Sequence, residues 1–374
     1  MSVAPAQNSA GEFFCKTFAS GTAGSPAQNP RVSVIVPVFN GRLQLPRCLE
    51  AISRSEFRDF EVIIMDDCST DNTRDIVERW GARYVRTPRK MGPGGARNLG
   101  VRHARGSVMV FVDADVVVPP EALGLISEDF ALDADLAALF GSYDEAPAWS
   151  DFLSQYKNLM HHYVHQTASE RAVTFWAGCG AVRREVFLEF GGFDHEKYPM
   201  PSIEDIEFGF RLSRAGRRIL LEKRLQVKHL KKWTVSVLWR ADIFGRAIPW
   251  TELILESRNL PSDLNLGWGA RISALLTVAL TSALIFFPLS LAGVLPFVTP
   301  GALAAAIAAL VIALLALNFR VYRWFFQRRG LAFTAAAVLA HWVYFFYSFA
   351  VFVLLSIRHV LQGREKNDET AAQA

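Results

Sequence analysis

Cysteine is scarce in this sequence, and its few cysteines are scattered. Four occur in 374 residues (Cys15, Cys48, Cys68 and Cys179), and none forms a C-x-x-C pair. Disulfide-rich secreted folds and cysteine zinc sites need more cysteines at closer spacing. We therefore interpret the four as unpaired thiols of a chain that works in a reducing compartment.

An excess of one charge and a glycine-rich phosphate loop are also missing. The net charge of +4 is too small to indicate a polyanion-binding surface, so we expect no nucleic-acid partner. Arg97 stands where a third glycine would complete a dinucleotide fingerprint after Gly92-Pro93-Gly94, and no G-K-[ST] follows a strand. These gaps exclude the two commonest glycine-based nucleotide sites.

The first 30 residues lack the apolar run of a signal peptide. Glu12 and Lys16 interrupt the apolar residues that are present, and Ala, Ser, Gly, Pro, Asn and Gln predominate. This composition is typical of disorder. We expect residues 1–30 to form a disordered N-terminal tail.

Long apolar runs occur only in the C-terminal part of the chain. The mean hydropathy of +0.19 is high for a soluble enzyme, and the excess comes from the stretches 272–295, 302–317 and 333–355. The first and third are long enough to span a bilayer, and the second is marginal. We expect a transmembrane region of about three spans at residues 271–357, followed by a polar tail at 358–374.

The charge of the linkers predicts the orientation of these spans. Residues 293–301 carry no charge, whereas residues 319–330 carry four arginines. The positive-inside rule places the second linker and the rest of the chain before the spans in the cytoplasm, so we expect a multi-pass protein of the cell membrane. Three spans would leave Arg358, Arg364 and Lys366 outside, so a two-span or re-entrant arrangement stays open.

The N-terminal half alternates between two hydrophobic periods. Predicted strands alternate with predicted helices, and such alternation predicts an α/β fold with a doubly wound sheet. The strands are expected at 32–38, 60–65, 83–86 and 108–112, and the helices at 45–53, 71–80 and 96–104. Ligands of such sheets bind beyond the carboxyl ends of the strands.

Polar side chains follow three of these strands and should meet at one edge of the sheet. They are Asn40, the pair Asp66-Asp67, and Asp113 with Asp115. Two carboxylates beside a buried strand repel each other and lose hydration, which a cation, a hydrogen-bonding loop or solvent could each offset. An isolated D-x-D is more often a helix cap and a solvated acid. Its place beside two other acidic strand ends favours Mg²⁺ or Mn²⁺, which would bridge the acids to a phosphate.

At this point the sequence resembles a known family. VSVIVPVFN, FEVIIMDDCSTDNT, GARNLG and VFVDAD, in this order, are similar to family 2 glycosyltransferases of the GT-A fold. AGCGAVRREVFLEFGGFD and EDIEFGFRLSRAG resemble the acceptor-side segments of that family, so the likeness covers about residues 31–230. It implies a GT-A-like doubly wound mixed sheet flanked by helices, before the α-helical membrane region, and inverting transfer of a sugar from a nucleotide sugar.

The resemblance also implies roles for individual residues. Asp67 would contact the donor base, Arg97 would lie near the nucleotide, and Asp113 would lie near the ribose or the metal. Asp115 would bind the metal. The same nucleotide-sugar site (UDP- or GDP-type) would include three residues at the end of the first strand, which are Pro37, Val38 and Asn40.

Glu204 and Asp205 are the candidate catalytic carboxylates. An attacking hydroxyl must lose its proton, which requires a general base. The alternative is that both acids only favour the N-terminus of the helix that they open. The resemblance makes Asp205 the base and Glu204 a supporting contact.

Two histidine motifs are more ambiguous. His229 in VKHLKKW is either a third metal ligand, as in some GT-A enzymes, or an interfacial histidine among lysines. His161, His162 and His165 could attract zinc, but only two of them can share a helix face, and no glutamate completes a H-E-x-x-H site. We prefer an amphipathic, membrane-near helix for this segment.

The sequence departs from the family in two places. His195 stands where the family commonly has an acid, and no Q-x-x-R-W follows Glu204-Asp205. Processive synthases of the family carry that motif, so we expect single, non-processive transfer. Arg323-Trp324 resembles part of it but suits an interface anchor better.

The segment from 211 to 246 is strongly basic and precedes the first apolar run. It is either a binding surface for anionic or phosphorylated lipids or an ordinary solvated surface. We expect a GT-A domain at 31–232 and an interfacial linker at 233–270.

Taken together, these features predict a membrane-bound, metal-dependent glycosyltransferase that acts on a lipid or lipid-linked acceptor. The alternatives are a polyprenyl-phosphate sugar synthase and a non-catalytic membrane scaffold that binds nucleotide sugars.

Overall fold

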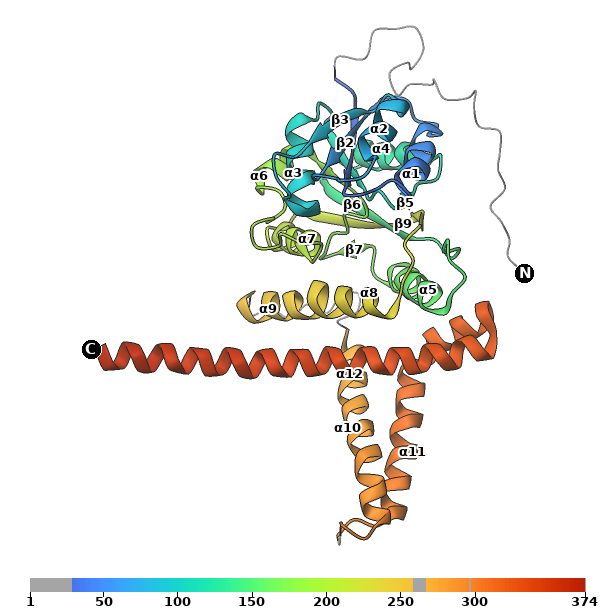
Figure 1. Ribbon diagram of the computed structural model, residues 1–374, viewed down its shortest axis with the longest axis vertical. Coiled ribbons are helices and arrows are strands. Elements are labelled where there is room, and N and C mark those ends of the chain that lie inside the picture. The colour runs from blue at the N-terminus through green and yellow to red at the C-terminus, as the bar shows by residue number, and fades with distance from the viewer. Residues whose placement is uncertain (1–28, 258–266, 296, 374) are drawn as a thin grey trace. The chain divides into compact units, whose positions relative to one another are not determined.

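The computed structural model describes residues 29–257, 267–295 and 297–373 (Figure 1). Most of the predicted tail and residues 258–266 of the predicted interfacial linker therefore lie outside the described residues. The chain divides into two compact units. We call residues 1–149 with 170–231 the sheet unit, and residues 150–169 with 232–374 the helical unit.

Four parallel strands build the first half of the sheet, in the order β3-β2-β1-β4. Every residue of β1 and β4 is buried, as expected for strands covered on both faces. The predicted alternation of strands and helices is confirmed. The elements are β1 (Val32–Val38), α1 (Leu45–Ser53), β2 (Phe60–Asp66), α2 (Thr73–Trp80), β3 (Arg83–Arg86), α3 (Gly92–His103) and β4 (Val108–Val112).

Antiparallel pairing makes the second half of the sheet mixed. β8 pairs antiparallel with both β4 and β6, and β9 runs parallel to β6 and antiparallel to the short β5 and β7. The predicted mixed α/β sheet with flanking helices is thus confirmed. The remaining elements of the sheet unit are β5 (Val116–Val117), α4 (Ala122–Leu132), β6 (Leu136–Tyr143), β7 (Arg171–Ala172), β8 (Cys179–Arg183), α6 (Arg184–Glu189), α7 (Glu204–Arg214) and β9 (Arg218–His229).

The helices α2 and α3 do not begin at the residues that the hydrophobic periodicity of the sequence predicts. α2 begins at Thr73 rather than at residue 71, because the Asp71 carboxylate accepts hydrogen bonds from the Thr73 backbone and hydroxyl. α3 begins at Gly92 rather than at residue 96. A Cβ on Gly92, whose φ is +72°, would lie 2.3 Å from the Pro199 oxygen, so tertiary packing rather than helix propensity fixes this start.

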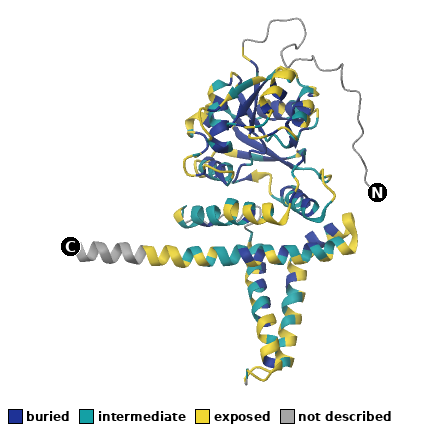
Figure 2. Ribbon diagram, viewed as in Figure 1, coloured by how far each residue is buried: buried dark blue, intermediate teal, exposed yellow. Residues whose placement is uncertain are grey.

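The core of the sheet unit differs on the two faces of the sheet. Aliphatic residues of β1, β2 and β4 pack against α1, α2 and α4 on one face. Buried phenylalanines fill the other, with ring centroids 5.2–6.4 Å apart, and they are Phe111, Phe175, Phe187, Phe193 and Phe208. Figure 2 shows that the strands of the sheet are largely buried. Two rigid layers thus hold the sheet on which the polar strand ends lie.

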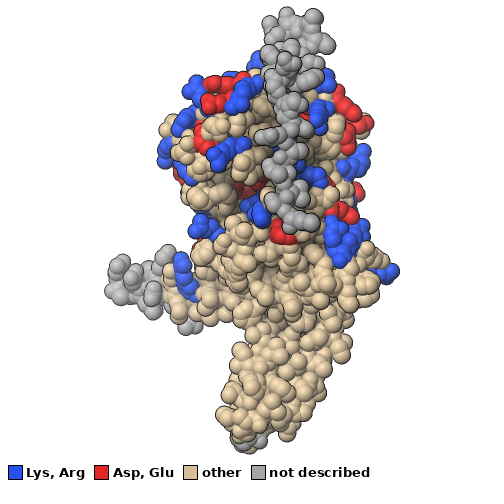
Figure 3. Space-filling model, turned by 45° about the vertical axis from the view of Figure 1, so that its right-hand side comes forward, with Lys and Arg blue, Asp and Glu red and all other residues tan. Residues whose placement is uncertain are grey.

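The helical unit contains three helices that are long and apolar enough to cross a membrane, α10, α11 and the apolar part of α12 (319–362). They match the three apolar runs predicted from the sequence, except that α10 ends at Leu291 rather than at residue 295. In the face shown by Figure 3, the surface of α10 and α11 has no Lys, Arg, Asp or Glu. The unit comprises α5 (Phe152–Thr167), α8 (Val235–Trp239), the π-helix η1 (Arg240–Ala247), α9 (Ile248–Ser257), α10 (Trp268–Leu291), α11 (Pro300–Leu317) and α12 (Phe319–Gln373), which is interrupted at Gly330.

Candidate active site

The loops after β1 and β2 are tied together at the carboxyl edge of the sheet. The Asp67 backbone donates to the Val38 oxygen at 2.8 Å, which joins the loop after β2 to the β1 end that holds Pro37. The Asn40 side chain accepts from the Thr70 backbone at 2.8 Å. Asn40 has a φ of 54°, an uncommon backbone conformation for a residue other than glycine. The predicted residues Pro37, Val38, Asn40 and Asp67 therefore share one edge.

The Asp67 carboxylate is buried and holds the start of α3. One oxygen accepts from the Met91 backbone at 2.7 Å and from the Thr87 hydroxyl at 3.1 Å, and the other accepts from the Gly92 backbone at 2.8 Å. Asp67 thus positions the loop from which α3 begins. Its predicted contact with a donor base stays a prediction.

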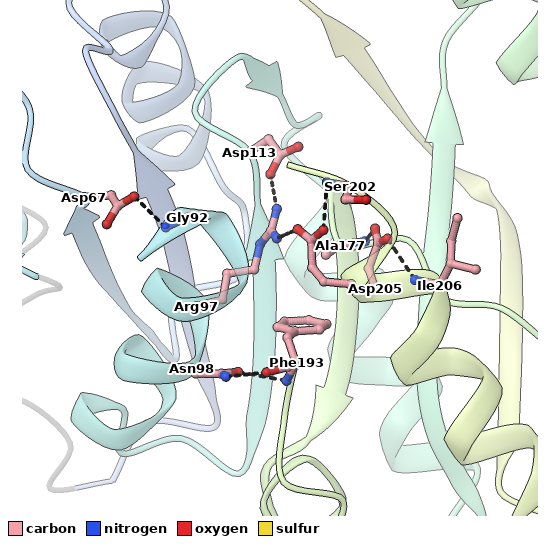
Figure 4. A network of polar contacts seen from close by, with 11 residues as sticks. Asp67, Gly92, Arg97, Asn98, Asp113, Ala177, Phe193, Ser202, Asp205 and Ile206 are labelled. Atoms are coloured by element: carbon pink, nitrogen blue, oxygen red, sulfur yellow. Dashed lines mark hydrogen bonds and ion pairs between the residues drawn. The ribbon is translucent and has the colours of Figure 1, made fainter. Parts of the chain in front are cut away.

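Arg97 joins two of the candidate carboxylates across the site (Figure 4). Its side chain is 5% exposed, and its Nη2 lies 2.6 Å from Asp113 Oδ1. Its Nη1 lies 3.2 Å from Glu204 Oε1. Arg97 is thus a buried cation that aligns the acid after β4 with the acid that opens α7. Its predicted place near the nucleotide stays a prediction.

Burial and the charge of Arg97 shift the pKa values of these acids in opposite directions. Burial raises the pKa of Glu204 to about 7, with a contribution from the Asp205 charge, although Arg97 opposes the shift. Burial also raises the pKa of Asp113, against the attraction of Arg97. Two of the acids on this edge are therefore stronger bases than ordinary carboxylates.

Asp205 is held by backbone donors and is still accessible. Its Oδ2 accepts from the Ala177 backbone at 2.9 Å, and its Oδ1 accepts from the Ile206 backbone at 2.8 Å. The side chain is partly exposed, whereas Glu204 is buried. A carboxylate oxygen can accept more than one hydrogen bond, so a fixed Asp205 can still accept a proton. Burial raises its pKa, which strengthens it as a base, although both backbone donors oppose the shift.

Asp115 and His229 form a second pair on the same edge. The register of β5 with β9 places Val116 opposite His229, and His229 Nε2 lies 3.5 Å from Asp115 Oδ2. The Tyr143 ring stacks on the His229 ring at 4.2 Å, with 9° between the planes. Burial opposes the ionisation of Asp115, but its hydrogen bond to His229 and the charges of His229 and Lys231 lower its pKa below the usual range.

The donor chemistry of this pair fits a divalent cation. A carboxylate and an imidazole, both anchored to β-strands, are ligands that Mn²⁺ accepts, and Mg²⁺ needs only one or two carboxylates beside phosphate oxygens. Asp115 is 30% exposed, so phosphate oxygens can approach it. Within residues 29–257, 267–295 and 297–373, no three His, Cys, Asp or Glu side chains form a preassembled metal cluster.

Two buried thiols, those of Cys48 and Cys179, lie close to the backbone around Asp113. Cys48 Sγ lies 3.7 Å from the Asp113 backbone oxygen, and Cys179 pairs with Val112 in the sheet. Burial raises the pKa of Cys179 to about 12 and that of Cys48 further still. Neither thiol supplies a thiolate for metal binding or catalysis.

Other predicted candidates lie elsewhere. His195 packs against α3, where a Cβ on Gly95 would lie 2.9 Å from its ring, and it belongs to the wall of the site. His161 and His165 belong to the helical unit, and their ring centroids lie 3.9 Å apart with the planes tilted by 34°, which agrees with the prediction that two of the three histidines share a face.

Arginines of the predicted basic segment mostly pair with acids. Such pairing is typical of a solvated surface rather than of a lipid-binding patch. The pairs are Arg211 with Glu207, Arg217 with Glu189, Arg218 with Asp133, and Arg224 with Glu222 and Asp129.

Three contacts of the site were missed by sequence reasoning. Arg97 bridges two acids, Tyr143 stacks on His229, and the Asn98 side chain bonds both backbone groups of Phe193, at 2.7 and 2.9 Å. Each joins segments that are far apart in the chain, so no local pattern reports them. The asparagine that follows Arg97 in GARNLG was the only visible signal.

Comparisons with known proteins agree with this geometry. Residues 33–191 match the family model for Glycosyl transferase family 2. Staphylococcus aureus TarS, a poly(ribitol-phosphate) β-N-acetylglucosaminyltransferase, is 34% identical over 25% of this chain and 18% of its own length. A Campylobacter jejuni GalNAc(5)-diNAcBac-PP-undecaprenol β-1,3-glucosyltransferase is 34% identical over 23% of this chain and 30% of its own length. The chain thus spans less than a third of either relative.

Solved structures include a Pyrobaculum calidifontis mannosyltransferase in complex with GDP-Man and Mn²⁺. It is 18% identical, and the alignment covers 89% of this chain and 90% of that one with a TM-score of 0.47. The match to the family model rests on the segment that holds β1 to β4 and their polar ends. Residues 33–191 therefore form a family 2 glycosyltransferase domain.

Proposed function

We propose that the chain is a membrane-bound, metal-dependent, inverting glycosyltransferase that moves one sugar at a time from a nucleotide sugar to a lipid or lipid-linked acceptor. The observation that carries the proposal is the accessible Asp205, which is fixed by two backbone donors beside the buried Arg97 bridge. This arrangement suits a general base that must keep one orientation.

Donor binding is assigned to the edge formed by the ends of β1, β2 and β4. Asn40 and Asp67 shape the nucleotide end, and Asp113 faces the ribose or the metal. Asp115 and His229 would hold Mn²⁺ or Mg²⁺ together with the diphosphate. Such a cation would stabilise the negative charge that develops on the leaving phosphate.

Asp205 would take the proton of the acceptor hydroxyl. As the hydroxyl oxygen bonds to the anomeric carbon, the bond from that carbon to the phosphate oxygen breaks. The bonding electrons leave with the nucleoside diphosphate. Attack from the face opposite the leaving group inverts the anomeric centre. Glu204 and Arg97 are positioning residues in this scheme, because both are buried. Arg97 contacts Asp113 and Glu204, and Glu204 also accepts a hydrogen bond from the Ser202 backbone just before α7.

The acceptor class is supported by the apolar helices and by one relative. Three helices are long and apolar enough to cross a membrane. The printed name of the C. jejuni relative describes a lipid-linked acceptor. The four arginines of the linker at 319–330 support a cytoplasmic location of the sheet unit.

Asp205→Asn tests the proposal. We expect transfer to a hydroxyl acceptor to fall at least about 100-fold, because removal of a general base costs that much or more. Binding of the nucleotide sugar should stay unchanged, as measured by thermal shift. Asp75→Asn on the exposed face of α2 is the matched control.

The outcomes separate the alternatives. Largely retained transfer by Asp205→Asn would indicate a phosphate acceptor, which is already ionised and needs no base. A wild-type protein that binds nucleotide sugars with Mn²⁺ but neither transfers nor hydrolyses them would be a non-catalytic scaffold.

A further inference from the structure

The neighbours of α12 distinguish it from the other two apolar helices. α10 and α11 pack along each other as a hairpin, whereas α12 crosses that hairpin at the end where α10 begins (Figure 1). Asn318, between α11 and α12, donates to the Ser273 hydroxyl near the start of α10 at 2.9 Å. α12 also packs against α5, η1 and α9, none of which is long or apolar enough to cross a membrane.

α5 packs against the first part of α12, on both sides of the Gly330 break. Near the start of α12, Tyr156 packs against Phe325 with ring centroids 6.1 Å apart. Beyond the Gly330 break, Phe152 packs against Phe333 at 5.3 Å. The amphipathic α5, predicted to lie near the membrane surface, therefore shares a buried apolar cluster with α12.

Charged groups contact the middle of the apolar stretch of α12. Tyr347 lies near the centre of residues 333–355, and its hydroxyl donates to Asp242 of η1 at 2.8 Å. Lys157 of α5 donates to both oxygens of the same carboxylate, at 2.8 and 2.9 Å. Arg246 lies 3.6 Å from Asp242, and its side chain is 53% exposed.

These charges conflict with a transmembrane α12. If α12 crossed the bilayer, Tyr347 would lie near half depth and would bring Lys157, Asp242 and Arg246 with it. A lipid-exposed arginine at that depth is strongly unfavourable. α10 and α11 differ, because Arg271 near the start of α10 is the only charged residue in either helix.

The exposed side of α12 is nevertheless apolar. Ala337, His341 and Phe345 recur at helical spacing and are buried. Large apolar residues on the opposite face are exposed, and they are Leu339, Val343, Phe346, Leu354 and Ile357. A helix with one face on charged protein elements and the other apolar and open suits the boundary between headgroups and acyl chains.

We infer that α12 lies in the plane of the membrane surface, on the side of the sheet unit, and that of the described helices only α10 and α11 cross the bilayer. The partner of the exposed face of α12 is the lipid boundary layer. The C-terminal end of α12 then stays on the side where α10 begins. This removes the conflict that three spans create at Arg358. The inference rests on the membrane association in the proposed function.

Cysteine labelling in intact cells tests the side on which α12 ends. In a Cys15→Ser, Cys68→Ser background, single cysteines replace Glu128 in α4, Gly293 after α10, and Arg358. We expect an impermeant maleimide to label Gly293→Cys from outside, and Glu128→Cys and Arg358→Cys only after permeabilisation. Labelling of Arg358→Cys together with Gly293→Cys in intact cells would overturn the inference.

Depth measurements in vesicles test the orientation of α12 independently. A fluorophore is attached at Leu339, Phe346 or Leu354, and nitroxide lipids quench it from the headgroup level or from the bilayer centre. We expect all three positions to be quenched equally, and more strongly by the shallow nitroxide. If the nitroxide at the bilayer centre quenched the fluorophore most strongly at Phe346 and less at Leu339 and Leu354, α12 would be a spanning helix.

Leu284, exposed near the middle of α10, separates failure of this inference from failure of the proposed membrane association. Deep quenching at Leu284 together with deep quenching at Phe346 overturns the position of α12 alone. Absence of deep quenching at Leu284 overturns the membrane association as well.

Discussion

Individual carboxylates of the site differ because their surroundings differ. Glu204 and Arg97 each have a side chain that is 5% exposed, whereas Asp113 and Asp115 are about one-third exposed. The buried pair is protected from solvent and competing ions, so it suits alignment. The exposed acids can exchange water for ligand oxygens. The burial of each side chain thus separates the proposed positioning residues from the proposed binding residues.

Glu204 should make stability depend on pH. Its pKa is 4.5 in an unfolded chain and about 7 in the folded protein, so the folded state retains a proton that the unfolded state loses. The resulting stabilisation is complete below pH 4.5 and is lost as pH rises through 7, a change of about 3 kcal/mol. In Glu204→Gln we expect this decline to be smaller, by about 3 kcal/mol, in melting curves of detergent-solubilised protein between pH 4.5 and 8. A remainder should persist, because burial also raises the pKa values of Asp113 and Asp205. Glu121→Gln on the surface should retain it, and an equal decline in both variants would refute the assignment.

Asp115 should control the response to manganese. We expect Asp115→Asn to raise the Mn²⁺ concentration for half-maximal transfer at least about tenfold, because a charged ligand is lost. Chelation should abolish transfer by the wild type, and added Mn²⁺ should restore it. Titration of Mn²⁺ at fixed nucleotide sugar measures the effect, with Asp75→Asn as the control. An unchanged titration would remove Asp115 from the metal site.

At the scale of elements, α7 carries both candidate catalytic acids and owes its position to close backbone packing. A Cβ on Gly209 would lie 2.2 Å from the Phe175 backbone nitrogen and 2.5 Å from the Thr174 carbonyl carbon. Only glycine lets the helix approach this closely. The distance from Asp205 to the sheet is therefore set one turn away from the acid itself.

Gly209→Ala should push α7 outward. We expect a loss of about 1–3 kcal/mol in stability and a clear drop in kcat, because the backbone cannot yield easily. Gly124→Ala in α4 is the matched control, since its Cβ would meet only Phe57 at 3.9 Å. It should keep full activity and gain up to about 1 kcal/mol. Activity assays and melting curves of both variants decide the matter, and an active, stable Gly209→Ala would contradict the packing account.

Elements were more predictable than the contacts between them. Periodicity located β1, α1 and β4 because each has a regular buried face. It misplaced the start of α3, where the Asp67 carboxylate and the packing of Pro199 override the poor helix propensity of Gly92-Pro93-Gly94. The alignment of Asp113 with Glu204 could not be predicted, because it depends on a fold-wide approach of β4 and α7.

At the scale of the whole molecule, the two units are interleaved along the chain. Residues 150–169 leave the sheet unit, join the helical unit as α5, and return to the sheet unit at residue 170. The chain leaves the sheet unit twice, after Trp149 and after Lys231. These two places lie together, because the Trp149 indole donates to the Leu230 oxygen at 2.8 Å. A single cut therefore cannot separate the units.

Two truncated chains test this organisation. A chain that ends at Lys231 keeps α5 without Val321, Tyr322 and Phe325, against which Tyr156 and Leu159 pack, so we expect it to aggregate. A chain that also replaces residues 150–169 by a flexible Gly/Ser linker should be monomeric and should bind nucleotide sugar. Size-exclusion chromatography and thermal shift provide the readouts. Two equally soluble chains would show that α5 needs no partner.

The buried thiols give the site a defined reactivity toward electrophiles and oxidants. Cys48 and Cys179 are buried beside Asp113, and burial raises their pKa values, so we expect neither to react with maleimides or peroxide at neutral pH. Cys68 is partly exposed at the same edge. Covalent reagents aimed at the proposed donor site should thus modify Cys68 rather than Cys48 or Cys179, and bound nucleotide sugar should protect it. This residue is a natural attachment point for a reporter of donor binding.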